Sequence, residues 1–176
     1  MKPIRQLLKT SIADGHERLE NLPIMRAYSN GDASFEEYIK VTDALAQFWT
    51  LHVPATRKLP EDFYRFFSSY LEALQRDINR AVVPSSLKPT NEIAFFYVLL
   101  GSGLGAKIIL KRNVKQTFPN ENLLVLAQNS GQLWQKFNDE HLQSVSDDQS
   151  SEVIEASKQL FNHLFNQICR IQLDFT

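Results

Sequence analysis

Residues 91–112 read NEIAFFYVLLGSGLGAKIILKR, and the rest of the chain is organised around this stretch. Its first half is strongly apolar, and its second half ends in Lys107, Lys111 and Arg112. Cations in the last turn of a helix are stabilised by the negative end of the helix dipole. The stretch therefore predicts a buried helix that ends at the basic residues.

Three of the six glycines in the protein, Gly101, Gly103 and Gly105, lie inside this helical pattern. Each glycine costs a helix about 1 kcal/mol relative to alanine, so the three together cost about 2–3 kcal/mol. Gly101 and Gly105 are one turn apart and share a face, with Ser102 and Ala106 beside them. This strip of small residues could pack closely against another helix, or it could lie against a flat ligand. The stretch by itself favours helix packing.

The composition of the chain predicts one soluble domain, residues 1–176. Of the 176 residues, 43% are hydrophobic and 22% are charged, as in an ordinary globular protein. The net charge of −1 gives no indication of binding to nucleic acid. Cys169 is the single cysteine, which excludes an internal disulfide and fits a reducing compartment. No apolar run approaches the roughly 20 residues of a membrane span, and no signal peptide follows Met1, so we expect a cytoplasmic protein.

Helical periodicity dominates the first half of the chain. A first helix is predicted from near Pro3, a favoured first-turn residue, to the residues before Asn21. Ser34 and Glu37 form a capping-box pattern at the start of a long second helix, and Pro60 begins a third. A loop follows, and Thr90 is the predicted N-cap of the central helix.

The second half of the chain is also predicted to be helical. A short helix is expected over 121–127, followed by a break at 129–131, another helix from Leu133 and a last helix from Val153 onwards. Loops are predicted at 28–33, 81–89 and 144–151. No stretch shows the sustained alternation of a strand. The predicted fold class is therefore all-α, a single domain of about seven helices.

His16 lies on the apolar face of the first helix, one turn after Ile12. Lys9 precedes it by two turns and Glu20 follows it by one turn, so these side chains point roughly the same way. A lone histidine on such a face is usually a core or rim residue satisfied by a hydrogen bond. The residues alone therefore leave the role of His16 open.

Several common chemistries lack their motifs in this sequence. The glycines follow a helical stretch rather than a strand, so they do not fit a dinucleotide-binding motif, and there is no phosphate-binding loop. His16, His52, His141 and His163 are not spaced for zinc on one helix, and no Glu-x-x-His pair indicates a di-iron bundle. What stands out is one histidine on an early helix, one glycine-interrupted helix and a high aromatic content.

Two segments resemble the heme oxygenase family. Residues 8–20, LKTSIADGHERLE, match the family's Leu-Lys, its heme-binding histidine and an acidic residue one turn later. Residues 97–106, YVLLGSGLGA, look like the family's distal helix, where bacterial members associated with bacteriophytochromes frequently carry Gly-Ser-x-Leu-Gly-Gly. The length between the segments and the helix order also fit, so the resemblance covers essentially the whole chain. It implies the soluble bacterial branch, of the bacteriophytochrome-associated type.

The resemblance implies a role for each residue of a heme site. His16 would bind the heme iron, with Glu20 as the acceptor for its other ring nitrogen, and Lys9 would pair with a propionate. The glycine strip would form the distal wall, so that no side chain competes with O2 for the iron. The implied catalytic residues are Gly101, Ser102 and Gly105. The implied heme-binding residues are His16, Lys9, Glu20, Tyr97, Gly101, Gly105, Ala106 and Phe161. Phe165 is the alternative to Phe161. Weaker candidates for pairing with a propionate are Lys107, Lys111, Arg112 and Lys136.

As the resemblance implies, the protein would be a heme oxygenase with heme as both cofactor and substrate. It would use O2 and electrons from a ferredoxin, flavodoxin or reductase, and it would release biliverdin, CO and ferrous iron. We expect a monomer or weak dimer without a membrane anchor. The electron donor, the meso carbon attacked and the biological purpose stay open.

Two departures from the family pattern bear on turnover. Many members carry an aspartate that organises distal water where this chain has Ser102, and the second glycine of the closing Gly-Gly is Ala106. These departures favour an alternative, a non-catalytic heme-binding or heme-carrying protein of the same fold. A third interpretation is a helical interaction domain, in which the glycines pack helices and His16 is a surface residue.

Overall fold

The described residues form seven α-helices and two very short strands. The computed structural model describes residues 2–113 and 117–173. The helices are α1 (Ile4–Glu20), α2 (Pro23–Asn30), α3 (Phe35–Leu51), α4 (Glu61–Ile78), α5 (Glu92–Arg112), α6 (Glu121–Lys136) and α7 (Asp147–Leu173). A π-helix, η1 (Phe137–Leu142), continues α6, and the strands are β1 (His52–Pro54) and β2 (Lys88–Thr90). The predicted all-α fold of about seven helices in one domain is confirmed.

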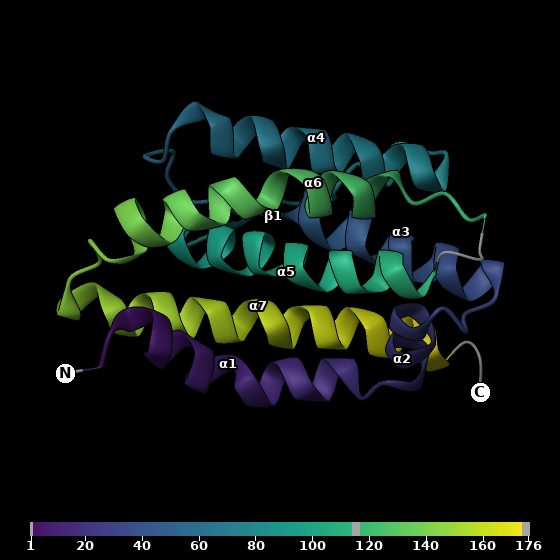
Figure 1. The fold of residues 1–176 in the computed structure, drawn as a ribbon, viewed down its shortest axis with the longest axis horizontal. Helices are drawn as coiled ribbons and strands as arrows, with labels where there is room; N and C mark the ends of the chain where they lie inside the picture. Colours follow the sequence, from purple (N-terminus) through teal and green to yellow (C-terminus); the bar gives the residue numbers. More distant parts are fainter. Residues whose placement is uncertain (1, 114–116, 174–176) are drawn as a thin grey trace.

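The central position in the bundle belongs to α5 (Figure 1). It packs against α6 on one side and α7 on the other, α1 lies along α7, and α4 packs on α3 and α6. Phe95, Phe96 and Leu99, from the first half of α5, are fully buried. Their neighbours include Trp49 and Phe63, whose rings make edge contacts with Phe95 and Phe96. The first half of α5 is therefore a core helix, as its apolar sequence predicts.

Several predicted helix ends are confirmed. α1 ends at Glu20, three residues before Pro23, and a proline disfavours helical backbone in the residue that precedes it. The capping box that begins α3 is complete, because the backbone N–H of Glu37 donates to the Ser34 hydroxyl at 3.1 Å and the Glu37 carboxylate accepts from the Ser34 N–H at 2.8 Å. Pro60 stands directly before α4.

Two predicted boundaries near turns are wrong. The loop expected over 28–33 begins only at Gly31, because α2 extends to Asn30 and ends in a left-handed glycine with φ of 80°. The N-cap of α5 is Asn91 rather than Thr90, since the Asn91 side chain accepts from the backbone N–H of Ala94 at 3.1 Å. Thr90 instead ends the strand β2.

The break predicted at 129–131 is also wrong, because α6 continues through these residues. Ser130 is buried where α6 meets Gly103 of α5, and Gly131 lies beside the Lys107 side chain. Small residues at these positions let the two helices approach closely, and this packing outweighs the weak helix propensity of glycine. The predicted loop 144–151 is likewise shorter than expected, because α7 begins at Asp147.

The strands β1 and β2 run parallel, with His52 opposite Lys88 and Pro54 opposite Thr90. They were not predicted, because three residues are too few to show the alternation of a strand. The end of the loop expected over 81–89 is therefore paired backbone. This pair connects the end of α3 to the start of α5.

By length and composition alone, α5 could also cross a membrane. The expectation that no segment reaches this limit is therefore wrong. Half of its apolar window is buried inside the bundle, as in the core helix of a globular protein. Length and composition do not separate these two cases.

Candidate functional site

His16 on α1 is the first element of the candidate site. Its imidazole is 53% exposed, and Nδ1 lies 3.4 Å from Oε2 of Glu20. On the other side, the ring stands edge-on to Phe161 of α7, with 5.7 Å between ring centroids. A methyl group on Gly15 would come within 3.2 Å of the Phe161 Cβ, so this glycine lets α1 sit close to α7. Three residues predicted for the site therefore meet at one place.

The exposed face of α5 is the second element. Leu104 is 58% exposed and Ile108 is 49% exposed, although α5 is the most apolar helix of the described chain. Between them, a methyl group on Gly105 would have no described atom within 4 Å. One on Gly101 would only touch the Trp134 ring, at 3.9 Å. This face is apolar and free of side chains at its centre, and none of the described residues covers it.

Gly103 has a different environment from its two neighbours. A methyl group there would collide with the side chain of Ser130 and approach the Leu126 carbonyl oxygen to 3.1 Å. Gly103 is therefore required for the contact between α5 and α6. Helix packing therefore explains Gly103, and it does not explain Gly105. A flat ligand against Gly105 stays a prediction.

The other predicted residues of α5 divide between the open face and the interior. The Ser102 hydroxyl donates to the Leu99 carbonyl of its own helix at 2.5 Å. Ala106 is only 1% exposed, so its predicted place beside Gly105 on the open strip is wrong and its methyl group points into the bundle. Tyr97 is buried and packs on Trp134, and this burial raises the pKa of its hydroxyl while Arg5 acts in the opposite direction.

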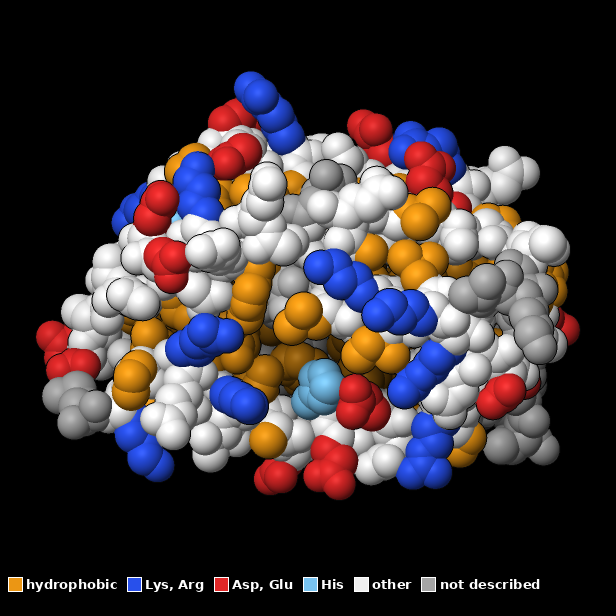
Figure 2. Space-filling model, viewed as in Figure 1, with side chains coloured by type: hydrophobic (Ala, Val, Ile, Leu, Met, Phe, Trp, Pro, Cys, Tyr) orange, Lys and Arg blue, Asp and Glu red, His pale blue; other side chains and the backbone are white. Residues whose placement is uncertain are grey.

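The open face of α5 and the start of α1 border the same space. The Arg5 guanidinium of α1 lies 5.9 Å from the centre of the Trp134 ring, and Trp134 in turn lies beside Gly101. Figure 2 shows a hollow on this side of the molecule, lined by hydrophobic side chains, with a histidine beside it and Lys and Arg side chains around it. The α1–α5 hollow, as we call it, is therefore apolar inside and basic at its rim.

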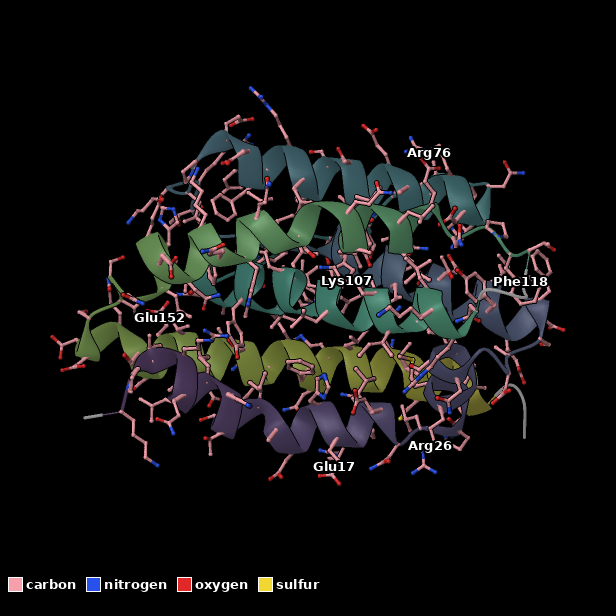
Figure 3. The ribbon with its side chains drawn as sticks, in the orientation of Figure 1. Glu17, Arg26, Arg76, Lys107, Phe118 and Glu152 are labelled. Atoms are coloured by element: carbon pink, nitrogen blue, oxygen red, sulfur yellow. The ribbon has the colours of Figure 1, made fainter. Side chains whose placement is uncertain are left out.

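The basic candidates differ in their partners. Lys9 and Lys107 are exposed, and Figure 3 marks Lys107 on α5 alongside α6. Arg112 donates to the Asn30 side chain at 3.0 Å, and Lys136 pairs with Asp62 at 3.1 Å. A ligand carboxylate at Arg112 or Lys136 would have to compete with these contacts.

Comparison with solved structures identifies the architecture. The structure resembles that of the NO- and CO-bound heme oxygenase from Neisseria meningitidis, with a TM-score of 0.72, covering 98% of this chain and 93% of that chain. The chain has the fold of a heme oxygenase. The two sequences are 18% identical, so the likeness concerns the fold. No protein-family model matches the sequence, and no curated protein matches it.

The α1–α5 hollow of this heme oxygenase fold suits a flat, apolar, iron-containing ring. Gly105 leaves a space that a Cβ would fill, Leu104 and Ile108 offer apolar surface, and His16 offers an exposed ring nitrogen. Heme has these properties and carries carboxylates that suit a basic rim. The residues present therefore fit the group that the fold implies.

Sequence reasoning missed Trp134 and Arg5 as site residues. The break wrongly predicted at 129–131 placed Trp134 on a separate helix, whereas in the continuous α6 it stands two turns from Leu126 and one turn from Ser130. The four-residue spacing of these three was the signal that could have found it. Nothing in the local sequence marks Arg5, because its contact with Trp134 spans the chain.

Proposed function

We propose that the protein is a heme oxygenase of the soluble bacterial, bacteriophytochrome-associated type. It would bind heme in the α1–α5 hollow and, with O2 and electrons from a ferredoxin, flavodoxin or reductase, convert it to biliverdin, CO and ferrous iron. The observation that carries this proposal is the pairing of an exposed His16 imidazole with the uncovered Gly105 face of α5. The heme oxygenase fold supports it.

On the α1 side, His16 would hold the iron. A ligating histidine donates its other ring N–H to an acceptor, which fixes the tautomer and the ring orientation. Glu20 would be this acceptor, because its carboxylate lies 3.4 Å from Nδ1, and Nε2 would then be left for the metal. Phe161 supports the ring from the other side. Bound heme would supply the iron at which O2 is reduced, as well as the macrocycle that is opened.

On the α5 side, the glycines would let the macrocycle approach the helix backbone. Gly101 and Gly105 leave the space, and Leu104 and Ile108 would cover the ring and exclude water. Lys9, exposed on α1, would pair with a propionate at the rim. The hydroxyl oxygen of Ser102 can still accept a hydrogen bond from water, although its proton is donated to Leu99.

The Ser102 contact favours a second candidate, a heme-binding protein without turnover. With its proton held by the Leu99 carbonyl, the hydroxyl can only accept a hydrogen bond from distal water, whereas a carboxylate at that position would offer two acceptor oxygens to order it. Ala106 no longer supports this alternative, because its methyl group is buried away from the open face.

A hemin titration followed by a single turnover tests both candidates. Hemin is added to the wild type, to His16→Ala and to Glu17→Ala, an exposed control on the side of α1 that faces away from α7 in Figure 3. We expect one heme per wild-type chain and per Glu17→Ala chain, with the Soret band shifted or weakened in His16→Ala. A reductant is then supplied in air. Formation of biliverdin supports the enzyme, heme that survives supports the binding protein, and absence of heme binding refutes both.

A further inference from the structure

A second cavity lies on the opposite side of α7 from His16. It has a volume of about 360 Å³ and lies between α7 and the β1–β2 pair. Its walls include His52, Lys88, Thr90, Gln159 and His163. Phe161 of α7 contacts His16, and His163 lies two residues further along, or about 200° further around the helix. The two sites therefore face different ways. The volume is in the range of small-molecule sites.

One end of this cavity gathers three basic groups. The imidazoles of His52 and His163 stack, with 5.3 Å between centroids and 26° between planes. The parallel strands place Lys88 directly opposite His52. His52 is only 2% exposed and is held in place by Phe48, at 4.5 Å between ring centroids, and by Thr90 at 3.3 Å from Nδ1. Protonation of either ring in this stacked, partly buried pair next to a lysine is electrostatically unfavourable without an anion.

The pKa shifts agree with this geometry. Burial, then His163 and then Lys88, in that order of importance, together lower the pKa of His52 to about 4. Burial and then Lys88 also lower the pKa of His163. Among the described residues, no carboxylate contributes in the opposite direction to either ring. An anion bound among the three groups would reverse these effects and favour protonated imidazoles.

The other end of the cavity is polar and acidic. Figure 3 marks Glu152 near the start of α7. It accepts from the Asn91 side chain at 3.1 Å, and Glu155 lies 3.9 Å from Lys158. Glu155 and His163 are eight residues apart, or about 12 Å along the helix. These carboxylates can accept hydrogen bonds from hydroxyl or amino groups while standing away from the basic end.

We propose that this cavity binds a small organic acid or phosphate ester. Its acidic group would lie among His52, His163 and Lys88, and its hydroxyl or amino groups would face Glu152 and Glu155. A bare phosphate would fill only the basic end of a cavity of this volume. The site does not depend on heme or on the proposed function, since it shares no residue with the α1–α5 hollow.

Histidine-ring NMR and calorimetry on the heme-free full chain test the proposal. The probes are glycerol 3-phosphate, malate, inorganic phosphate and uncharged glycerol. We expect saturable shifts of the His52 and His163 signals, unchanged His16 signals, and tighter binding at about pH 6 than at about pH 7.5. Either glycerol 3-phosphate or malate should bind more tightly than inorganic phosphate. The tighter of the two probes shows whether the acidic group of the ligand is a phosphate ester or a carboxylate. Glycerol should cause no shift.

Variants at exposed positions keep the test independent of folding. Lys88→Gln should weaken binding about tenfold, the loss of roughly one charge-assisted contact, and His163→Gln should reduce the pH dependence. Arg170→Gln, an exposed cation in the last turn of the same helix that does not line the cavity, should change the affinity less than about twofold. No saturable shift with any anion up to about 10 mM would overturn the proposal. Equal losses in Lys88→Gln and Arg170→Gln would also overturn it, as would phosphate binding as tightly as both organic probes.

Discussion

Alanine at Gly105 and at Gly103 should have opposite effects on the heme-free protein, although the two glycines are two residues apart on α5. A methyl group at Gly105 meets no described atom within 4 Å, whereas one at Gly103 collides with the Ser130 side chain. If Gly105 exists for a ligand and Gly103 for packing, stability and heme binding should separate between the two variants.

The magnitudes follow from the two environments. Gly105→Ala should raise the free energy of unfolding by about 0.5–1 kcal/mol, because alanine is the better helix former and no contact is disturbed. Gly103→Ala should lower it by about 1–3 kcal/mol, the usual cost of overpacking, since the gain in propensity is smaller than the steric penalty. For heme the order is reversed, because a methyl group at Gly105 stands where the macrocycle would approach the backbone.

Urea unfolding without heme, followed by hemin titration of each folded variant, measures both quantities. Ser130→Gly provides the matched control, since combining it with Gly103→Ala removes the colliding side chain and should restore part of the lost stability. The reasoning is refuted for Gly105 if its alanine variant is stabilised and binds hemin as tightly as the wild type. It is refuted for Gly103 if its alanine variant is as stable as the wild type.

Three further changes have defined outcomes. Glu20→Gln should leave folding unchanged but shift the Soret band of bound heme, because it weakens the hydrogen-bond acceptor for His16. Glu17→Gln, on the outer side of α1, should leave the Soret band where it is in the wild type. Identical spectra of the Glu20→Gln variant and the wild type would exclude a role for the Glu20 carboxylate. His52 has a pKa of about 4 in the folded protein against about 6.5 when unfolded, so the unfolded chain takes up the proton first as the pH drops. The free energy of unfolding should therefore fall between pH 6.5 and pH 4, by up to about 1.4 kcal/mol per pH unit. His52→Gln should flatten that part of a urea-midpoint against pH curve, and an unchanged curve would contradict the assignment. Glu92→Gln should lower the free energy of unfolding in urea by about 1–3 kcal/mol. The reason is that this buried carboxylate accepts hydrogen bonds from the backbone N–H groups of the two residues before Pro60 and from a tyrosine hydroxyl. A loss below about 0.5 kcal/mol would contradict this stabilising role of Glu92.

The helices could be predicted because their signals are local, whereas the two segments of the candidate site were predicted from their resemblance to the motifs of a known family. The capping box at Ser34 and the apolar stripe of α5 depend on residues within a few turns of each other. The continuity of α6 could not be predicted, because Ser130 and Gly131 are poor helix residues that only the contact with Gly103 explains. Tertiary packing outweighed propensity there.

The same limit applies to the site. The sequence places Ala106 one residue from Gly105, but the direction of its methyl group depends on how α5 is rotated against α6 and α7, and it turns out to be buried. The contact between Arg5 and Trp134 spans most of the chain, so no local pattern could indicate it. The second cavity likewise depends on β1 and β2, which are too short to be seen in the sequence.

The choice among the three interpretations now depends on particular residues. A purely structural domain explains Gly103, but a methyl group on Gly105 would touch none of the described residues, and two large apolar side chains of α5 are exposed beside it. Helix propensity favours alanine at an uncovered position, so the glycine and the exposed Leu104 and Ile108 together favour a flat ligand on that face. Ala106 is buried and does not distinguish an enzyme from a binding protein. That distinction depends on whether the Ser102 hydroxyl, bonded to Leu99, can still order the water that proton delivery requires.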